Sequence, residues 1–280
     1  MRRLAFIFGV CAAIGSAQNV PPSDLAELVR CAARHNDRNL EATRNYTFLR
    51  RSVEKRLDER GNVIKTENKT YEVLFLYGRP YARLLRIDDK PLSPEEERKE
   101  KVKFEKETAS RARESQRQRD KQSEQEHEEA EERRQMLREM ADGFHWRLEG
   151  EEMVSGVPTL ILDATPIAGY QGKTRGGRLL KNFRGKMWLD PVTCRIARVE
   201  AHVVDTVSFG WFLLRVRPGT TLSFELARMP DEVWLPRRLY LKGSAKIALF
   251  KDYRLEMENT WSDYRKFQSD SRVISNTTVP

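Results

Sequence analysis

Hydrophobic and polar residues alternate with a period of two along most of the chain after residue 143. Successive apolar faces are formed by Val199, Ala201 and Val203, by Leu222, Phe224 and Leu226, and by Ile247 and Leu249 with Tyr253, Leu255 and Met257. Turn signals rich in Gly, Pro and Asp separate these runs at intervals of about ten residues. Such alternation is typical of strands with one face in solvent, so the pattern predicts an up-and-down antiparallel sheet.

Helical spacing precedes the first strands. Residues 23–37 place apolar side chains at helical intervals after Ser23, a suitable N-cap. Alternating runs then begin near Tyr46 and cover 71–77 and 82–87. Further strands are expected over 233–241, ended by Gly243, and over 245–257.

One strand breaks the alternation. Within the strand expected over 206–216, residues 207–214 (Val-Ser-Phe-Gly-Trp-Phe-Leu-Leu) are apolar on both faces. Three interpretations stay open: burial beneath a helix, a strand that reaches into a ligand cavity, or an exposed lip that touches a membrane.

Residues 93–142 form a charged insertion with 13 Lys/Arg and 16 Asp/Glu. Ser93, Pro94 and Glu96 are typical of a helix start, and strong helix formers follow. Only the end, from Met136 to Phe144, carries an apolar stripe that can pack on a core. The insertion therefore predicts a solvated helix, with a frayed or disordered middle as an open alternative, and this helix either has no partner or binds one.

The first 17 residues read as a secretory signal. A basic start is followed by an apolar stretch of about a dozen residues and small residues up to Ala17. We expect cleavage there and a soluble mature chain, 18–280, in the periplasm or outside the cell. Cys31 and Cys194 then remain, either bridged across a loop of about 160 residues or as two buried thiols.

Composition and motifs limit the classes of function that the sequence supports. The 39% hydrophobic content argues against wholesale disorder, and no apolar run is long enough for a membrane helix. Gly172-Lys173-Thr174 lacks the earlier glycine of a phosphate loop, because position 167 is Ile. The four histidines show no metal-enzyme spacing, and no Gly-x-Ser-x-Gly elbow is present. We therefore expect no enzyme, cofactor or metal, with a secreted hydrolase assembled from distant residues as an alternative.

The net charge of +9 is concentrated outside the insertion and the signal. Residues 168–186 carry six basic residues, no acid and five glycines. The glycines predict a mobile loop, which is either simply solvated or attracts an anionic head group or phosphate. Nucleic acid is not an expected partner, because the aromatic residues lie in strand faces rather than in this loop.

Short motifs resemble a known family. Residues 185–191 (Gly-Lys-Met-Trp-Leu-Asp-Pro) followed by 195–200 (Arg-Ile-Ala-Arg-Val-Glu) resemble a hairpin of the outer-membrane lipoprotein carrier family. This family includes the LolA and LolB types and the sigma-factor regulator RseB. Residues 233–237 (Val-Trp-Leu-Pro-Arg) resemble another of its strands. The resemblance implies an α+β fold: a strongly curved antiparallel sheet of about 10–11 strands, an incomplete barrel, in one domain that this chain extends by its insertion.

The function expected from the resemblance is binding or transport of a lipid, lipoprotein or other hydrophobic ligand in the concave face. An envelope regulatory or scaffolding module that binds a protein through residues 93–142 is the alternative. The side chains expected near the cavity are Phe75, Trp188, Phe209, Trp211, Leu213, Phe224 and Trp234, with Arg175, Arg178 and Lys181 at its mouth.

Overall fold

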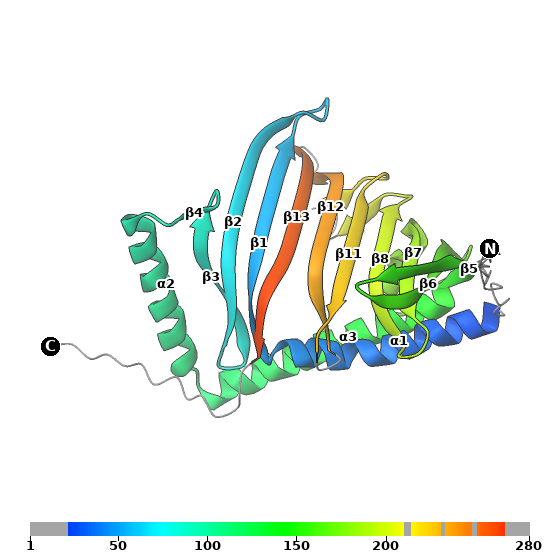
Figure 1. The fold of residues 1–280 in the computed structure, drawn as a ribbon, viewed down its shortest axis with the longest axis horizontal. Helices are drawn as coiled ribbons and strands as arrows, with labels where there is room; N and C mark the ends of the chain where they lie inside the picture. The colour runs from blue at the N-terminus through cyan, green and yellow to red at the C-terminus, as the bar shows by residue number, and fades with distance from the viewer. Residues whose placement is uncertain (1–21, 210–213, 231–232, 248–250, 267–280) are drawn as a thin grey trace, which may run out of the picture.

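A computed structural model describes residues 22–209, 214–230, 233–247 and 251–266 of the 280. The expected α+β architecture is confirmed: one open antiparallel sheet of 13 strands with a few helices (Figure 1). The helices are α1 (Pro22–Thr43), α2 (Pro94–Ala112), α3 (Gln116–Gly143) and the short 3₁₀ helix η1 (Gly177–Asn182). The signal expected over residues 1–17 lies outside the described residues, and in the described ranges no helix is long and apolar enough to cross a membrane.

The strands run β1 (Tyr46–Leu57), β2 (Val63–Leu76), β3 (Arg79–Ile87), β4 (Lys90–Pro91), β5 (Phe144–Val154), β6 (Val157–Pro166), β7 (Phe183–Asp190), β8 (Arg195–Val203), β9 (Val207–Phe209), β10 (Leu214–Val216), β11 (Thr221–Arg228), β12 (Trp234–Ile247) and β13 (Lys251–Lys266). Their order is β4-β3-β2-β1-β13-β12-β11-β8-β7-β6-β5, and β10 adds to β12. The sheet curves but has two separate edges, β4 and β5, so it is an incomplete barrel (Figure 1).

Helices α1 and α3 lie antiparallel beside each other along one end of the strands (Figure 1). Arg30 of α1 pairs with Asp142 of α3 at 2.9 Å, and Arg44, just after α1, pairs with Glu126 at 3.3 Å. The apolar side of α1 packs with the end of α3 against β5, β6 and β7, and this packing forms the largest buried cluster. The largest part of the core therefore sits at one end of the sheet.

The charged insertion forms two ordered helices instead of a single helix. Ser93 and Glu96 make the expected capping box at the start of α2, and Ser115 with Gln118 make a second one at the start of α3. A new start of this kind breaks the helix, because Ser115 accepts a hydrogen bond from the backbone of the following turn in an extended conformation. The chain between the two helices therefore turns a corner.

Helix α2 packs against strand β3. The rings of Tyr81 and Phe104 meet edge to face with centroids 5.5 Å apart. The Glu100 carboxylate accepts hydrogen bonds from the Tyr81 hydroxyl at 3.1 Å and from the Leu84 backbone N–H at 3.2 Å. Arg111 donates to carbonyl oxygens of the turn between β2 and β3. These contacts protect an edge strand whose backbone groups would otherwise be open to pairing.

Three strand expectations were wrong, and one of them is the strand expected over 245–257, which is divided between the end of β12 and the start of β13. The single strand expected over 206–216 is instead the hairpin β9–β10, whose strands pair with each other. A run that is apolar on both faces gives no alternation by which to locate a reversal. The turn expected at Gly243 is absent, because β12 continues through it to Ile247. A side chain at 243 would overlap Thr220, so this glycine serves close packing and not a turn.

Replacing Glu100 by Ala is expected to loosen α2 from β3. The change removes two hydrogen bonds to a mostly buried carboxylate, which corresponds to a loss of about 2 kcal/mol of unfolding free energy. Denaturant unfolding measures the loss, and hydrogen exchange at the Leu84 amide should accelerate. Glu105→Ala, on an exposed side of α2, is the matched control. Equal stability of the two variants would contradict this account of the docking.

Candidate functional site: an apolar trough on the inner face

Cross-strand pairing identifies which side chains share the face that the helices cover. Residues directly opposite each other on antiparallel strands point to the same side of the sheet. One row of such residues crosses the sheet from β6 to β12. Each member is opposite the next, in the order Leu162, Met187, Val199, Phe224 and Leu239. Leu162 and Met187 are 0% and 2% exposed because they pack in the cluster with α1 and α3. The whole row therefore belongs to this inner face.

A second row runs beside the first. It crosses the sheet from β7 to β13, and each member is opposite the next, in the order Gly185, Ala201, Leu222, Leu241 and Met257. Where the two rows pass from β8 to β13 their apolar side chains stay half-buried. We call this set the apolar trough; it consists of Val199, Ala201, Leu222, Phe224, Leu239, Leu241 and Met257. A contiguous apolar surface of this kind marks a binding site more often than isolated exposed residues do.

A small apolar hollow opens at the β7–β8 end of the trough. Its volume is about 120 Å³, and its walls include Met140 at the end of α3, Leu180 of η1, and Met187, Val199 and Ala201 of the sheet. Sites that enclose whole small molecules measure roughly 300–1,000 Å³. The hollow is therefore large enough for the end of an apolar chain, and the remainder of such a chain would lie along the open trough.

The loop of residues 168–186, called the basic loop from here on, is held beside the hollow by a buried carboxylate. Glu139 of α3 is 3% exposed, and its two oxygens accept the backbone N–H groups of Lys173 and Thr174, both at 2.9 Å. A Cβ at Gly177 would overlap the Glu139 carboxylate, and one at Gly176 would overlap Met136. The glycines expected to make this loop mobile instead let it pack closely against α3.

The basic side chains expected at the cavity mouth point into solvent from this loop. Arg175, Arg178 and Lys181 are exposed, and Arg178 donates a hydrogen bond to the Lys173 carbonyl at 3.0 Å. The same segment contributes Leu180 to the wall of the hollow. The loop thus brings positive charge and apolar lining close together.

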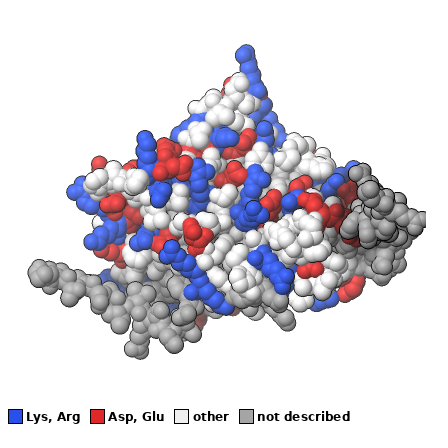
Figure 2. Space-filling model, in the orientation of Figure 1, with Lys and Arg blue, Asp and Glu red and all other residues white. Residues whose placement is uncertain are grey.

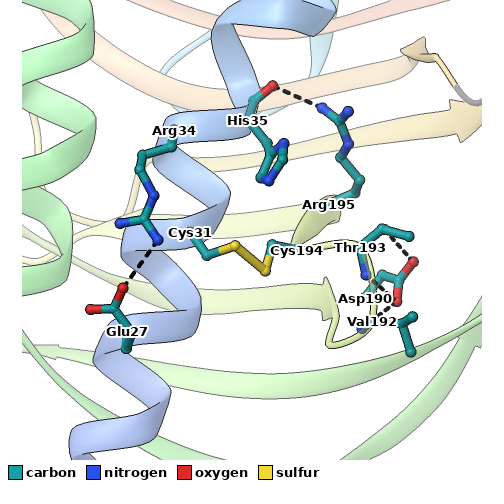
Figure 3. Close-up of a disulfide and its surroundings, with 9 residues drawn as sticks. All are labelled: Glu27, Cys31, Arg34, His35, Asp190, Val192, Thr193, Cys194 and Arg195. Atoms are coloured by element: carbon teal, nitrogen blue, oxygen red, sulfur yellow. Dashed lines mark hydrogen bonds and ion pairs between the residues drawn. A yellow bond between two sulfur atoms is a disulfide. The ribbon is translucent and has the colours of Figure 1, made fainter.

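A disulfide joins Cys31 of α1 to Cys194 in the turn between β7 and β8 (Figure 3). Arg195 donates a hydrogen bond to the His35 carbonyl of α1 at 2.8 Å, so two bonds fix the helix to this turn. The turn itself is ordered by Asp190, whose carboxylate accepts the backbone N–H groups of the next residues in the turn. The structure thus contains the bridged form of the two open alternatives.

Away from the buried cluster around Trp188, the outer face of the sheet is polar. Its cross-strand neighbours include the ion pairs Arg238–Glu258 at 2.5 Å and Lys55–Glu256 at 3.0 Å. Lys and Arg are interspersed with Asp and Glu on the surface shown in Figure 2, so the net positive charge forms no single-sign field there. Exposed pairs of this kind contribute little stability and serve mainly to solvate the face.

The aromatic side chains expected in the cavity are distributed over several places. Phe224 lies in the trough and its ring centroid is 6.5 Å from that of Trp261. Trp188 and Trp234 are 5% and 2% exposed in another side-chain cluster. The Trp188 indole N–H donates to Glu152 at 2.6 Å, and Arg198 covers its ring. These two tryptophans are thus packed by the chain itself.

Phe75 lines a different cleft, of about 620 Å³, beneath α3. Its other walls are mainly polar and include Glu126, His127 and Arg133. The Phe209 side chain, Trp211 and Leu213 lie outside the described residues. Within the described ranges, no group of three or more His, Cys, Asp or Glu is placed to hold a metal ion.

The sequence signal for the trough was the alternation itself. Val199, Ala201, Leu222 and Met257 stand on the apolar faces that the period of two identifies. Neighbours on a strand point to opposite faces, so Trp188 cannot share a face with Met187 and Leu189. The alternation of side chains along β7 therefore identified inner-face residues better than the size of aromatic side chains did.

Several solved structures of bacterial proteins resemble this chain at low sequence identity. A putative outer membrane lipoprotein-sorting protein domain from Vibrio parahaemolyticus is 10% identical with a TM-score of 0.34, and the match covers 88% of this chain and 95% of that one. The LolA superfamily protein NE2245 from Nitrosomonas europaea is 9% identical with a TM-score of 0.25 and coverage of 83% and 93%. The complex structure of Pseudomonas aeruginosa MucA/MucB gives 11% identity, a TM-score of 0.23 and coverage of 88% and 100%.

These structures are of the kind that the sequence resemblance indicates. No protein-family model matches the chain, and no curated protein matches it. At identities and TM-scores this low, the likenesses set neither a ligand nor a partner for this chain.

Replacing Glu139 by Ala is expected to release the basic loop. The Lys173 and Thr174 amides lose a charged acceptor, so their hydrogen exchange should accelerate and the unfolding free energy should fall by about 2–3 kcal/mol. Glu132→Ala, an exposed position on the same helix, should change neither quantity. Unchanged exchange at both amides in Glu139→Ala would contradict the anchoring role.

Removing the disulfide in the double variant Cys31→Ser/Cys194→Ser is expected to destabilise the chain. In the chain-entropy model, a loop with a sequence separation of 163 residues corresponds to at most about 5 kcal/mol. Denaturant unfolding of the variant and of the reduced wild type should give the same lowered midpoint. A variant as stable as the oxidised wild type would show that the bridge contributes nothing.

Proposed function

We propose that this chain is an exported binding or carrier protein that holds the hydrocarbon chain of an amphiphile in the apolar trough. The observation that carries the proposal is the half-buried apolar surface between β8 and β13, on the face that α1 and α3 cover only at one end. A curved sheet with an uncovered apolar face is stabilised by whatever fills it. The proposed activity is burial, with no covalent step.

The dimensions of the trough match a single hydrocarbon chain. From Val199 on β8 to β13 there are three inter-strand steps, which together span about 14 Å. A lipid tail occupies half of a bilayer core and is therefore about 15 Å long. Each methylene removed from water contributes roughly 0.8 kcal/mol. A chain lying across the strands, with its end in the hollow, would thus gain enough for stable binding.

Export is part of the proposal. The signal-like start of the sequence supports it, and so does the disulfide, because such bonds persist mainly in oxidising compartments. The periplasm or the extracellular space therefore suits both features.

A protein partner on the insertion is a second candidate. Helix α2 has no buried residue although it is firmly attached to β3. A rigid, highly charged surface beyond the edge of the sheet would suit an envelope protein of complementary charge. This surface is separate from the trough, so the two activities are compatible.

Placing a lysine in the trough is the test. Leu222→Lys puts a charge among apolar side chains and should weaken binding of the neutral probe N-phenyl-1-naphthylamine about tenfold or more. Ser223→Lys is the matched control, because it adds the same charge to the same strand on the other face. Mass spectrometry of lipids extracted from the purified wild type should find a bound amphiphile. A wild type that carries no lipid and binds no probe would remove the proposed function.

A further inference from the structure

The inner face changes from apolar to polar along its own cross-strand rows. Beyond Leu239, the first row continues through Asn259 of β13 and Ser52 of β1 to Lys69 of β2. Beyond Met257, the second row continues to Glu54. We call the side chains at this end the polar strip; it consists of Arg50, Ser52, Glu54, Lys69, Tyr71 and Asn259. The inner face is thus apolar along the trough and becomes polar at the polar strip, on β13, β1 and β2.

Most charges of the polar strip already have partners in the chain. Lys65 and Lys69 both donate to Glu67, at 2.5 and 2.8 Å, and these hydrogen bonds lower the pKa of Glu67 to about 2. Glu54 accepts the hydroxyl of Tyr253 at 2.6 Å. A carboxylate with two ammonium partners and one with a phenol donor are satisfied without a ligand.

Arg50 differs from its neighbours. Its guanidinium lies over the Tyr71 ring, 5.0 Å from the centroid, and it makes no hydrogen bond or ion pair with the described part of the chain. The Arg50 Nε and the Asn259 Oδ1 are both shielded from solvent and have no hydrogen-bond partner. Shielded polar atoms are normally paired in folded proteins, so the Arg50 Nε points to a missing acceptor, whereas the Asn259 Oδ1 would need a donor.

The two side chains are neighbours on the inner face. Arg50 is opposite Trp261 and Ser52 is opposite Asn259, so Arg50 and Asn259 are diagonal neighbours on one face, about 7 Å apart. An arginine presents several N–H donors in a planar fork that fits the oxygens of a carboxylate or phosphate. The Asn259 Nδ2 beside it already donates to the Met257 Sδ at 3.9 Å, so Asn259 borders this site without supplying a free donor.

We propose, given the function proposed above, that Arg50, beside Asn259, binds the anionic head group of the amphiphile whose chain lies in the trough. The head group is a carboxylate or a phosphate. Between Asn259 and Val199 lie three inter-strand steps of about 4.8 Å, which matches the length of one lipid tail. The ligand therefore lies across the strands, with its tail directed to the hollow and its head at β1 and β13. The exposed basic loop is at the opposite end.

Matched ligands separate the head group from the chain. Palmitate, hexadecyl phosphate and methyl palmitate have chains of sixteen carbons and differ in the charge of the head. Each is titrated against the neutral probe bound to the wild type, Arg50→Met, Arg86→Met and a triple variant with Gln at positions 175, 178 and 181. Arg86 is an exposed arginine at the edge of the sheet, so its replacement removes the same charge elsewhere.

Arg50→Met is expected to weaken binding of at least one anionic ligand about tenfold, while methyl palmitate stays within about twofold. The anionic ligand that responds identifies the head group as carboxylate or phosphate. Unchanged binding of methyl palmitate shows that the variant is folded and that its trough is intact.

Three results overturn the inference. Anionic ligands that bind Arg50→Met as well as wild type would exclude the head-group site and leave the proposed function standing. The same loss in Arg86→Met or in the triple variant would assign the effect to overall charge or to the basic loop. Binding of none of the three ligands to the wild type would remove the proposed function and this inference together.

Discussion

The structure depends on how little helix is available to cover a large curved sheet. An apolar sheet face must be covered by another layer, and two helices lying along one end of 13 strands can cover only part of it. Where α1 and α3 lie, Leu162, Met187 and Leu189 are buried; where they do not, the same rows continue as half-buried leucines and methionine. The apolar trough is thus a direct result of this partial coverage.

The attachments around the trough use a few well-buried polar contacts. Glu139 holds the basic loop through two backbone N–H groups, and Glu100 holds α2 through a hydroxyl and an edge-strand N–H. In both cases a carboxylate on a helix satisfies backbone donors that would otherwise be left without partners. Charged insertions are usually solvated, and here a few of their acids fix the loops and edges that frame the inner face.

Local patterns predicted the parts of the molecule that local physics determines. The period of two located most strands and the apolar side of β8 and β11, and the serine–glutamate spacing at residue 93 located the start of α2. The hairpin β9–β10 and the continuous strand β12 were missed, because neither an apolar run nor an isolated glycine reveals what packs against it. The packing around Gly243 depends on Thr220, a partner the local pattern does not show.

The polar strip could not be predicted from the sequence. It exists because β1 pairs with β13, which places Ser52 opposite Asn259, about 200 residues further along the chain. Aromatic size directed the sequence expectations to Trp188 and Trp234, which the chain itself buries. Register between distant strands, rather than residue type, decides which side chains meet on the inner face.

The pairing of distant segments also sets an order of assembly. Cys31 can be bonded only after Cys194 has left the ribosome, and β1 finds its second neighbour only when β13 has been made. Because the chain is made from its N-terminus, α1 and β1 exist long before these partners. Until then α1 lacks its disulfide partner and β1 is paired only with β2, so the whole architecture closes late and from its C-terminal half.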